Sequence, residues 1–159
     1  MLTKTKTTYL VIGYGNTLRH DDGAGYKVAE AVADWGIEGV RSLPLHQLTP
    51  DLAEAIAHAK IVIFVDAVAE TPEAQPTIKV ERLEPSSRET FTGHCADPRS
   101  LLAFAKILYG TLPIAYRILI PAFDFSFGEM FSPITEAGIS IALSKIKELI
   151  RFSEIERRE

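Results

Sequence analysis

Apolar and polar positions form blocks along the chain that predict strands alternating with helices. Short apolar runs at Thr8 to Gly13, Val40 to Leu45, Lys60 to Ala67 and Ala115 to Pro121 are typical of buried strands. The segment Thr77 to Leu83 alternates instead, so one of its faces is expected to meet water. Because its link to the preceding strand is too short for a crossover helix, we expect it to be antiparallel and at an edge.

Between these strands, apolar residues recur at helical spacing. They predict helices that begin near Gly23, Thr49-Pro50, Asp97-Pro98 and Ser132-Pro133, where caps and prolines favour a first turn. The charged tail, about residues 153–159, is expected to fray. Strands alternating with helices predict a single domain, 1–159, of the α/β class: a three-layer α/β/α sandwich with a mostly parallel sheet and one antiparallel strand.

Composition limits the classes of protein that fit. The chain has 159 residues, 47% of them hydrophobic, which suits one core, and no apolar run reaches the roughly 18 residues of a membrane span. A net charge of −4 without a basic cluster argues against nucleic-acid binding. The single cysteine, Cys95, excludes an intrachain disulfide and a cysteine-rich metal site. We therefore expect a soluble cytoplasmic protein without a membrane or nucleic-acid partner.

Three side chains that can bind a metal are expected at one edge of the sheet. Asp22 follows the first strand and Asp66 ends the third, and ligand sites form at the carboxyl ends of such strands, near the switch in strand order. The loop from Leu83 to His94 can span roughly 35 Å, longer than a strand of about 20 Å, so His94 can return to this edge. Two carboxylates and one imidazole suit a divalent metal such as nickel or zinc.

Each of these residues also has a simpler interpretation. Asp21 and Asp22 can stabilise the first turn of a helix through its dipole. Asp66 can be a turn residue, and His94 can be a surface residue. Only their convergence would make them a site.

Two further positions leave alternatives open. His46 and Gln47 end the second strand at the same edge, and a functional role there is weighed equally with a plain helix entry. Cys95 beside His94 invites a cysteine–histidine nucleophile, but adjacent residues rarely face one another, so Cys95 is favoured as a small packing residue.

A dinucleotide site is the natural rival for the glycine-rich turn after the first strand. Gly13 and Gly15 fit its fingerprint, but Leu18 occupies the third glycine position. Asp21 and Asp22 then place negative charge where a pyrophosphate would lie. We therefore expect no nucleotide cofactor.

Several motifs together resemble those of the nickel–iron hydrogenase maturation endopeptidases. The similarity is carried by Gly13 to Leu18 with Asp21 to Gly25, by Val65-Asp66-Ala67 and by Gly93-His94. The segment His46-Gln47-Leu48-Thr49-Pro50-Asp51-Leu52 resembles the branch that processes the bidirectional, NAD-linked hydrogenase. The resemblance runs over nearly the whole chain.

The resemblance implies a twisted five-stranded sheet between helices and a single cut near the C-terminus of the hydrogenase large-subunit precursor. Nickel carried by that precursor would be the recognition signal, and the activity would be that of an aspartyl-type endopeptidase. The oligomeric state stays open, and a monomer is favoured for the enzyme alone. Asp22, Asp66 and His94 match the positions that contact metal and act in catalysis. Substrate contact or support would come from Asn16, Asp21, His46 and Gln47.

Two departures from the family pattern bear on mechanism. Many relatives carry glutamate where this chain has the shorter Asp22, and many carry an Asp-Gly-rich motif where it has His46-Gln47-Leu48. The metal could polarise the scissile carbonyl or activate water, with Asp22 or Asp66 as base, or it could only dock the precursor. The alternatives outside this class are a non-catalytic nickel- or precursor-binding maturation chaperone and a nucleotide-dependent enzyme.

Overall fold

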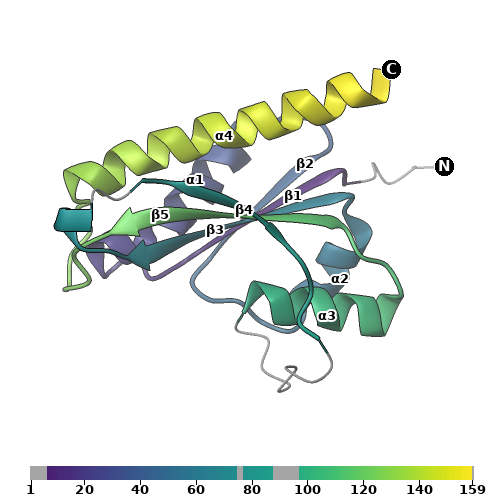
Figure 1. Cartoon of the computed structure of the whole chain (residues 1–159), viewed down its shortest axis with the longest axis horizontal. Helices are drawn as coiled ribbons and strands as arrows, with labels where there is room; N and C mark the ends of the chain where they lie inside the picture. Colours follow the sequence, from purple (N-terminus) through teal and green to yellow (C-terminus); the bar gives the residue numbers. More distant parts are fainter. Residues whose placement is uncertain (1–6, 75–76, 88–96, 159) are drawn as a thin grey trace.

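The protein folds around one five-stranded sheet with helices on both faces (Figure 1). The computed structural model describes residues 7–74, 77–87 and 97–158. Two short 3-10 turns, η1 and η2, interrupt the alternation of strands and helices. The elements in chain order are β1 (Tyr9–Tyr14), η1 (His20–Gly23), α1 (Ala24–Asp34), β2 (Val40–Leu45), α2 (Leu52–His58), β3 (Ile61–Ala69), η2 (Pro72–Ala74), β4 (Lys79–Leu83), α3 (Pro98–Tyr109), β5 (Ile114–Ala122) and α4 (Pro133–Arg158).

The strand order is β2-β1-β3-β5-β4, and only β4 runs antiparallel to its neighbour. The predicted fold class, a three-layer sandwich with a mostly parallel sheet and one antiparallel edge strand, is confirmed. From β1 the chain passes outward to β2 on one side and later to β3 on the other. The switch in strand order therefore lies between the carboxyl ends of β1 and β3, where open α/β sheets bind ligands.

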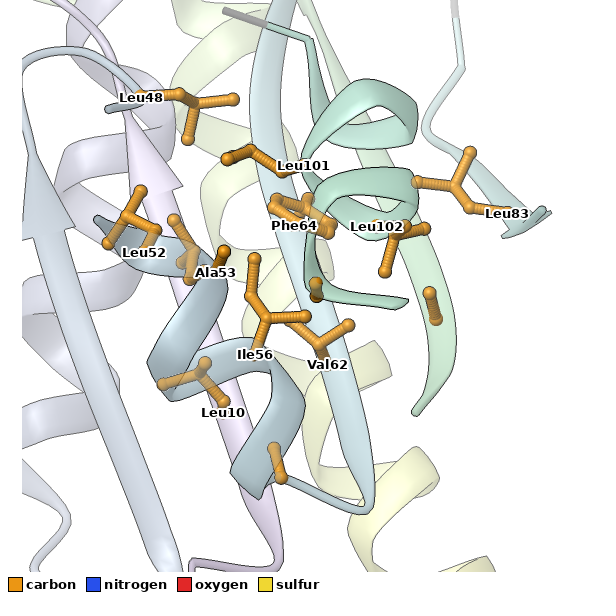
Figure 2. Close-up of a cluster of buried hydrophobic side chains, with 14 residues drawn as sticks. Leu10, Leu48, Leu52, Ala53, Ile56, Val62, Phe64, Leu83, Leu101 and Leu102 are labelled. Atoms are coloured by element: carbon orange, nitrogen blue, oxygen red, sulfur yellow. The ribbon is translucent and has the colours of Figure 1, made fainter. Parts of the chain in front are cut away.

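Each face of the sheet buries its own apolar cluster. One cluster joins the sheet to α2 and α3, and Figure 2 shows Phe64 of β3 between Ile56 of α2 and Leu101 and Leu102 of α3. The other joins the opposite face to α1 and α4 and includes Ile146. The strands between these layers are buried on both sides, which explains the unbroken apolar run in β3.

The ends of the helices show where local signals hold. Asp97 caps α3 as expected, because its Oδ1 accepts the Arg99 N–H at 3.2 Å. The helix expected from Thr49-Pro50 begins at Leu52, after a turn. The backbone of α4 is helical through Arg158, so it includes most of the tail, about 153–159, for which fraying stays a prediction. None of the described helices has the length and apolar character of a membrane span.

Candidate active site

The loop after β1 is fixed by short hydrogen bonds that position Asp22. Asp22 lies in η1, which leads directly into α1. The Asn16 N–H donates to Asp22 Oδ2 at 2.8 Å, and the Leu18 N–H donates to Asn16 Oδ1 at 2.9 Å. The half-buried Asp22 carboxylate thus closes the loop with one oxygen, and the described residues form no hydrogen bond to its Oδ1.

The start of α1 packs directly against the end of β1 and against β3 where its pairing with β1 ends. A Cβ added to Gly25 would lie 2.3 Å from the carbonyl oxygen of Val65 and 2.7 Å from that of Tyr14. Only glycine allows this approach, since both neighbours are backbone atoms. Asp22 lies just before α1, and Asp66 is the first residue of β3 beyond its pairing with β1. The contact therefore brings Asp22 to the same edge of the sheet as Asp66.

Asp66 is held at that edge by two hydrogen bonds. The Tyr14 hydroxyl donates to Asp66 Oδ2 at 3.0 Å, and the Ala67 N–H donates to Asp66 Oδ1 at 2.8 Å. Burial, followed by the charge of Asp66, raises the pKa of Tyr14 above its ordinary value, so this hydroxyl remains a donor. Each Asp66 oxygen keeps a further lone pair for a ligand.

The two carboxylates interact with each other. Burial raises the pKa of the Asp66 carboxyl to about 6, the hydrogen bonds from Tyr14 and Ala67 oppose that rise, and the charge of Asp22 adds to it. The Arg117 guanidinium lowers the pKa again, but Arg117 Nη2 is already paired with Glu81 Oε2 at 2.9 Å. A bound cation would relieve this burial and repulsion, so the pair fits a metal ion chemically.

Ionised Asp66 is expected to cost folding stability. Its folded pKa of about 6 exceeds the ordinary 3.8, so the folded protein holds the extra proton and stability falls as pH rises from about 4 to 6. Asp66→Asn keeps the shape and stays neutral, and its amide can donate to the Tyr14 hydroxyl oxygen. We expect the free energy of unfolding of this variant to exceed that of the wild type by roughly 1–2 kcal/mol at pH 8, after allowance for the partial exposure of Asp66.

Urea unfolding of the two proteins between pH 4 and 8 measures this difference. The advantage of Asp66→Asn should shrink steadily below pH 6 and vanish near pH 4. The exposed Asp51, whose side chain caps no N–H, supplies a control, and Asp51→Asn should show no such trend. A pH-independent difference at Asp66 would contradict the assigned environment.

Asp21 has a different role from the one expected. It is fully buried, and its Oδ2 accepts hydrogen bonds from the N–H groups of Phe123 and Asp124 at 2.8 and 3.0 Å. Ser132 donates its N–H to Oδ1 and its hydroxyl to Oδ2, both at 2.7 Å. The predicted substrate contact or support by Asp21 is therefore wrong as regards contact, because four donors occupy the carboxylate and tie η1 to the segment between β5 and α4.

Loss of the Asp21 charge is expected to destabilise the fold. Burial alone would raise its pKa, but the hydrogen bonds from Ser132, Phe123 and Asp124 outweigh it and hold the pKa below 3.8. This contribution is complete above about pH 4 and is lost as pH falls through the folded pKa. Asp21→Asn turns an amide N–H toward a donor, which should cost about 2–4 kcal/mol at pH 7.

Thermal and urea unfolding of Asp21→Asn test this role. The stability of Asp21→Asn should lie well below that of the wild type at pH 7. This difference in stability should narrow toward pH 3, where the Asp21 carboxylate of the wild type takes up a proton. Asp51→Asn serves again as the exposed control. An Asp21→Asn protein as stable as the wild type at pH 7 would refute the anchoring role.

The remaining predicted contacts lie around the same edge. The Asn16 side chain is exposed and caps the Leu18 N–H. His46 is exposed and its ring stacks on Tyr26 of α1, with centroids 5.3 Å apart and planes at 17°. Gln47 is exposed beside it. These positions suit substrate contact, which stays a prediction.

The predicted third ligand cannot be placed. His94 and Cys95 lie outside the described residues. Among the residues that are described, no group of three or more His, Cys, Asp or Glu side chains could hold a metal ion. The structure thus brings together Asp22 and Asp66 of the predicted set.

Sequence reasoning missed Tyr14 and Arg117. Tyr14 follows Gly13 in the first motif, and the β1–β3 register, Gly13 opposite Val65, would have placed it beside Asp66. Arg117 interrupts the apolar run of β5, which is an unusual position for a charge in an inner strand. Its partner is Glu81, directly opposite on the neighbouring strand β4. Both signals become readable only once strand order is known.

Comparison with known proteins establishes the fold. No protein-family model and no curated protein matches the chain. Among solved structures, it is similar to the hydrogenase maturating endopeptidase HybD from E. coli, with 22% identity, coverage of 92% of this chain and 93% of that one, and a TM-score of 0.73. A hydrogenase 2 maturation peptidase from a Thaumarchaeota archaeon matches at 22% identity, with coverages of 90% and 97% and a TM-score of 0.65. The [NiFe] hydrogenase maturation protease HybD from Thermococcus kodakarensis matches at 19% identity. That match covers 89% of this chain and 98% of that one, with a TM-score of 0.67.

Proposed function

We propose that this chain is an endopeptidase that removes the C-terminal extension of a nickel–iron hydrogenase large-subunit precursor after nickel insertion. One observation carries the proposal: Asp22 and Asp66 converge at the switch in strand order of a fold shared over nine tenths of both chains with hydrogenase maturation endopeptidases. That fold supports many chemistries, so the paired carboxylates are what favour hydrolysis.

The carboxylates can supply the proton transfers of peptide hydrolysis. A base must take a proton from the attacking water, and an acid must give one to the departing nitrogen. Burial raises the pKa of Asp66 to about 6, so its carboxylate can accept that proton at neutral pH as long as it is not itself bound to nickel, which would lower this pKa. Its protonated carboxyl then returns the proton to the leaving amine, which restores the carboxylate.

Nickel enters this proposal as part of the substrate. Asp22 has an oxygen with no hydrogen bond from the described residues, and both Asp66 oxygens keep a lone pair, so each can contact a metal presented by the precursor. His94 would complete the set. Bound there, nickel would polarise the scissile carbonyl or mark the precursor as ready.

Metal-free precursor tests whether cleavage needs nickel at all. If nickel serves either use, metal-free precursor is left uncut, and a purified enzyme that binds no metal alone yet cleaves nickel-loaded precursor favours recognition. Cleavage of metal-free precursor at the normal rate would refute nickel recognition. The proposal further includes aspartyl-type chemistry, a monomeric enzyme and a cytoplasmic location.

Coexpression of the precursor with this chain tests the proposal against the chaperone alternative. The enzyme should convert the large subunit to a faster-migrating form on a denaturing gel, and Asp66→Asn should not. A chaperone would retain the precursor at full length in a complex with this chain. Full-length precursor that carries nickel, in the presence of the folded wild type, would refute the peptidase.

A further inference from the structure

Large apolar side chains stand exposed beside the candidate active site. Phe127 is 86% exposed and Met130 78%, both between β5 and α4, and Leu18 of the loop after β1 is 56% exposed. A parallel bridge pairs Arg19 with Gly128, which sets the preceding residues, Leu18 and Phe127, side by side. We call Leu18, Phe127 and Met130 the rim patch.

The backbone beneath the rim patch is firmly held. The Gly128 N–H donates to Leu18 O at 2.9 Å, and the His20 N–H donates to Gly128 O at 2.7 Å. His20 Nδ1 lies 2.7 Å from the carbonyl oxygen of Met130 and 3.0 Å from its nitrogen. Gly128 has φ of 149° and faces the His20 ring so closely that a Cβ would clash with it. The fixed backbone keeps the apolar side chains at the surface.

Other hydrogen bonds join the rim patch to the candidate active site. Asn16 bridges the two, since its side chain accepts the Leu18 N–H and its own N–H donates to Asp22. From below, buried Asp21 anchors Phe123, Asp124 and Ser132, which flank Phe127 and Met130 along the chain. A molecule bound at Asp22 would therefore lie next to the rim patch.

The size of the rim patch indicates which partner it fits. Three such side chains offer roughly 400 Å², about half of the 800 Å² per partner that a standard stable interface buries. That area is too small for a lasting dimer but suits a short peptide segment that is held during one reaction. Exposed apolar groups fixed beside a site are typical of a binding surface.

We propose that the rim patch docks an apolar segment of the precursor next to its scissile bond; this rests on the proposed function. The docked segment would extend away from Asp22 and Asp66 across Leu18 toward Phe127 and Met130. The patch would thus select a precursor segment with apolar side chains, while the carboxylates act on the neighbouring bond.

The test compares precursor cleavage by the wild type and by the double variant Phe127→Gln, Met130→Gln. Both positions are exposed, so the fold should survive, and circular dichroism checks this. We expect KM for nickel-loaded precursor to rise about 10-fold or more, with kcat within about 3-fold of the wild type. Ile107→Gln with Leu108→Gln, at 59% and 54% exposure at the far end of α3, is the matched control and should leave KM unchanged.

The outcomes separate this inference from the proposed function. If the wild type cleaves the precursor and the double variant has the same KM, the docking role is refuted and the peptidase stands. If the wild type does not cleave, the peptidase fails, and biolayer interferometry with uncleaved precursor decides the docking role by itself: about 10-fold weaker binding by the double variant supports it, and equal or absent binding refutes it. If sedimentation shows a wild-type dimer that the double variant abolishes, the patch binds a second copy and the inference is wrong.

Discussion

Asp66→Asn is expected to lower precursor processing by about 10³-fold or more, because it removes a base from the reaction and a ligand from the site. The change is nearly isosteric, and the amide can keep hydrogen bonds with Tyr14 and Ala67. Stability should rise rather than fall, as argued from the raised pKa of Asp66. Single-turnover cleavage of nickel-loaded precursor measures the loss.

Opposite effects on activity and stability make this variant informative. Replacement of an aspartate with a merely structural role would lower activity and stability together. The Asp51→Asn control should process precursor at the wild-type rate. Processing by Asp66→Asn within about 3-fold of the wild type would remove Asp66 from the reaction.

Gly25→Ala is expected to destabilise the protein by about 2–4 kcal/mol, despite the helix preference of alanine. The new methyl group would lie 2.3 Å from Val65 O, 2.7 Å from Tyr14 O and 3.0 Å from Tyr14 N. All three are backbone atoms, two at the end of β1 and one within β3, so α1 must move away from the sheet. Urea unfolding at pH 7 measures the loss.

An exposed position on the same helix controls for helix preference. Glu30→Ala removes only a surface pair with Lys27 and should change stability by less than about 0.5 kcal/mol. Since α1 carries η1 with it, Gly25→Ala should also slow processing in the fraction that folds. Stability of Gly25→Ala equal to that of Glu30→Ala would mean that the close approach of α1 to the strands does not occur.

Much of the fold could be predicted because the apolar pattern is local. The unbroken run of β3 predicted a strand buried on both faces, and the short link after it predicted the antiparallel β4. The start of α2 was less certain, since a threonine and a proline fit a turn as well as a first helical turn.

The candidate site was predictable only in part. Asp22 follows β1 as expected. Asp66 was expected to end the third strand but lies within β3, which continues to Ala69 beside β5; it stands just past the pairing of β3 with β1, so the parallel order of β1 and β3 still brings it to the edge of Asp22. Asp21 differs, because its role depends on hydrogen-bond donors of Phe123 and Ser132, more than a hundred residues away in the sequence. The residues near Asp21 give no sign of these donors. Tyr14 likewise gains its role from a partner 52 residues away.

The exposed aromatic residues illustrate the same limit. Phe131 packs against the core beside α4. Phe127 instead lies almost fully in water. The difference arises from the Asp21 and His20 hydrogen bonds, which fix the backbone between them.

The intact mass of purified, nickel-loaded large-subunit precursor after incubation with this protein tests the central claim most directly. Cleavage predicts two products whose masses sum to the precursor plus one water, the smaller being a C-terminal peptide, and no products with Asp66→Asn. An unchanged precursor mass with folded wild-type protein would contradict the claim.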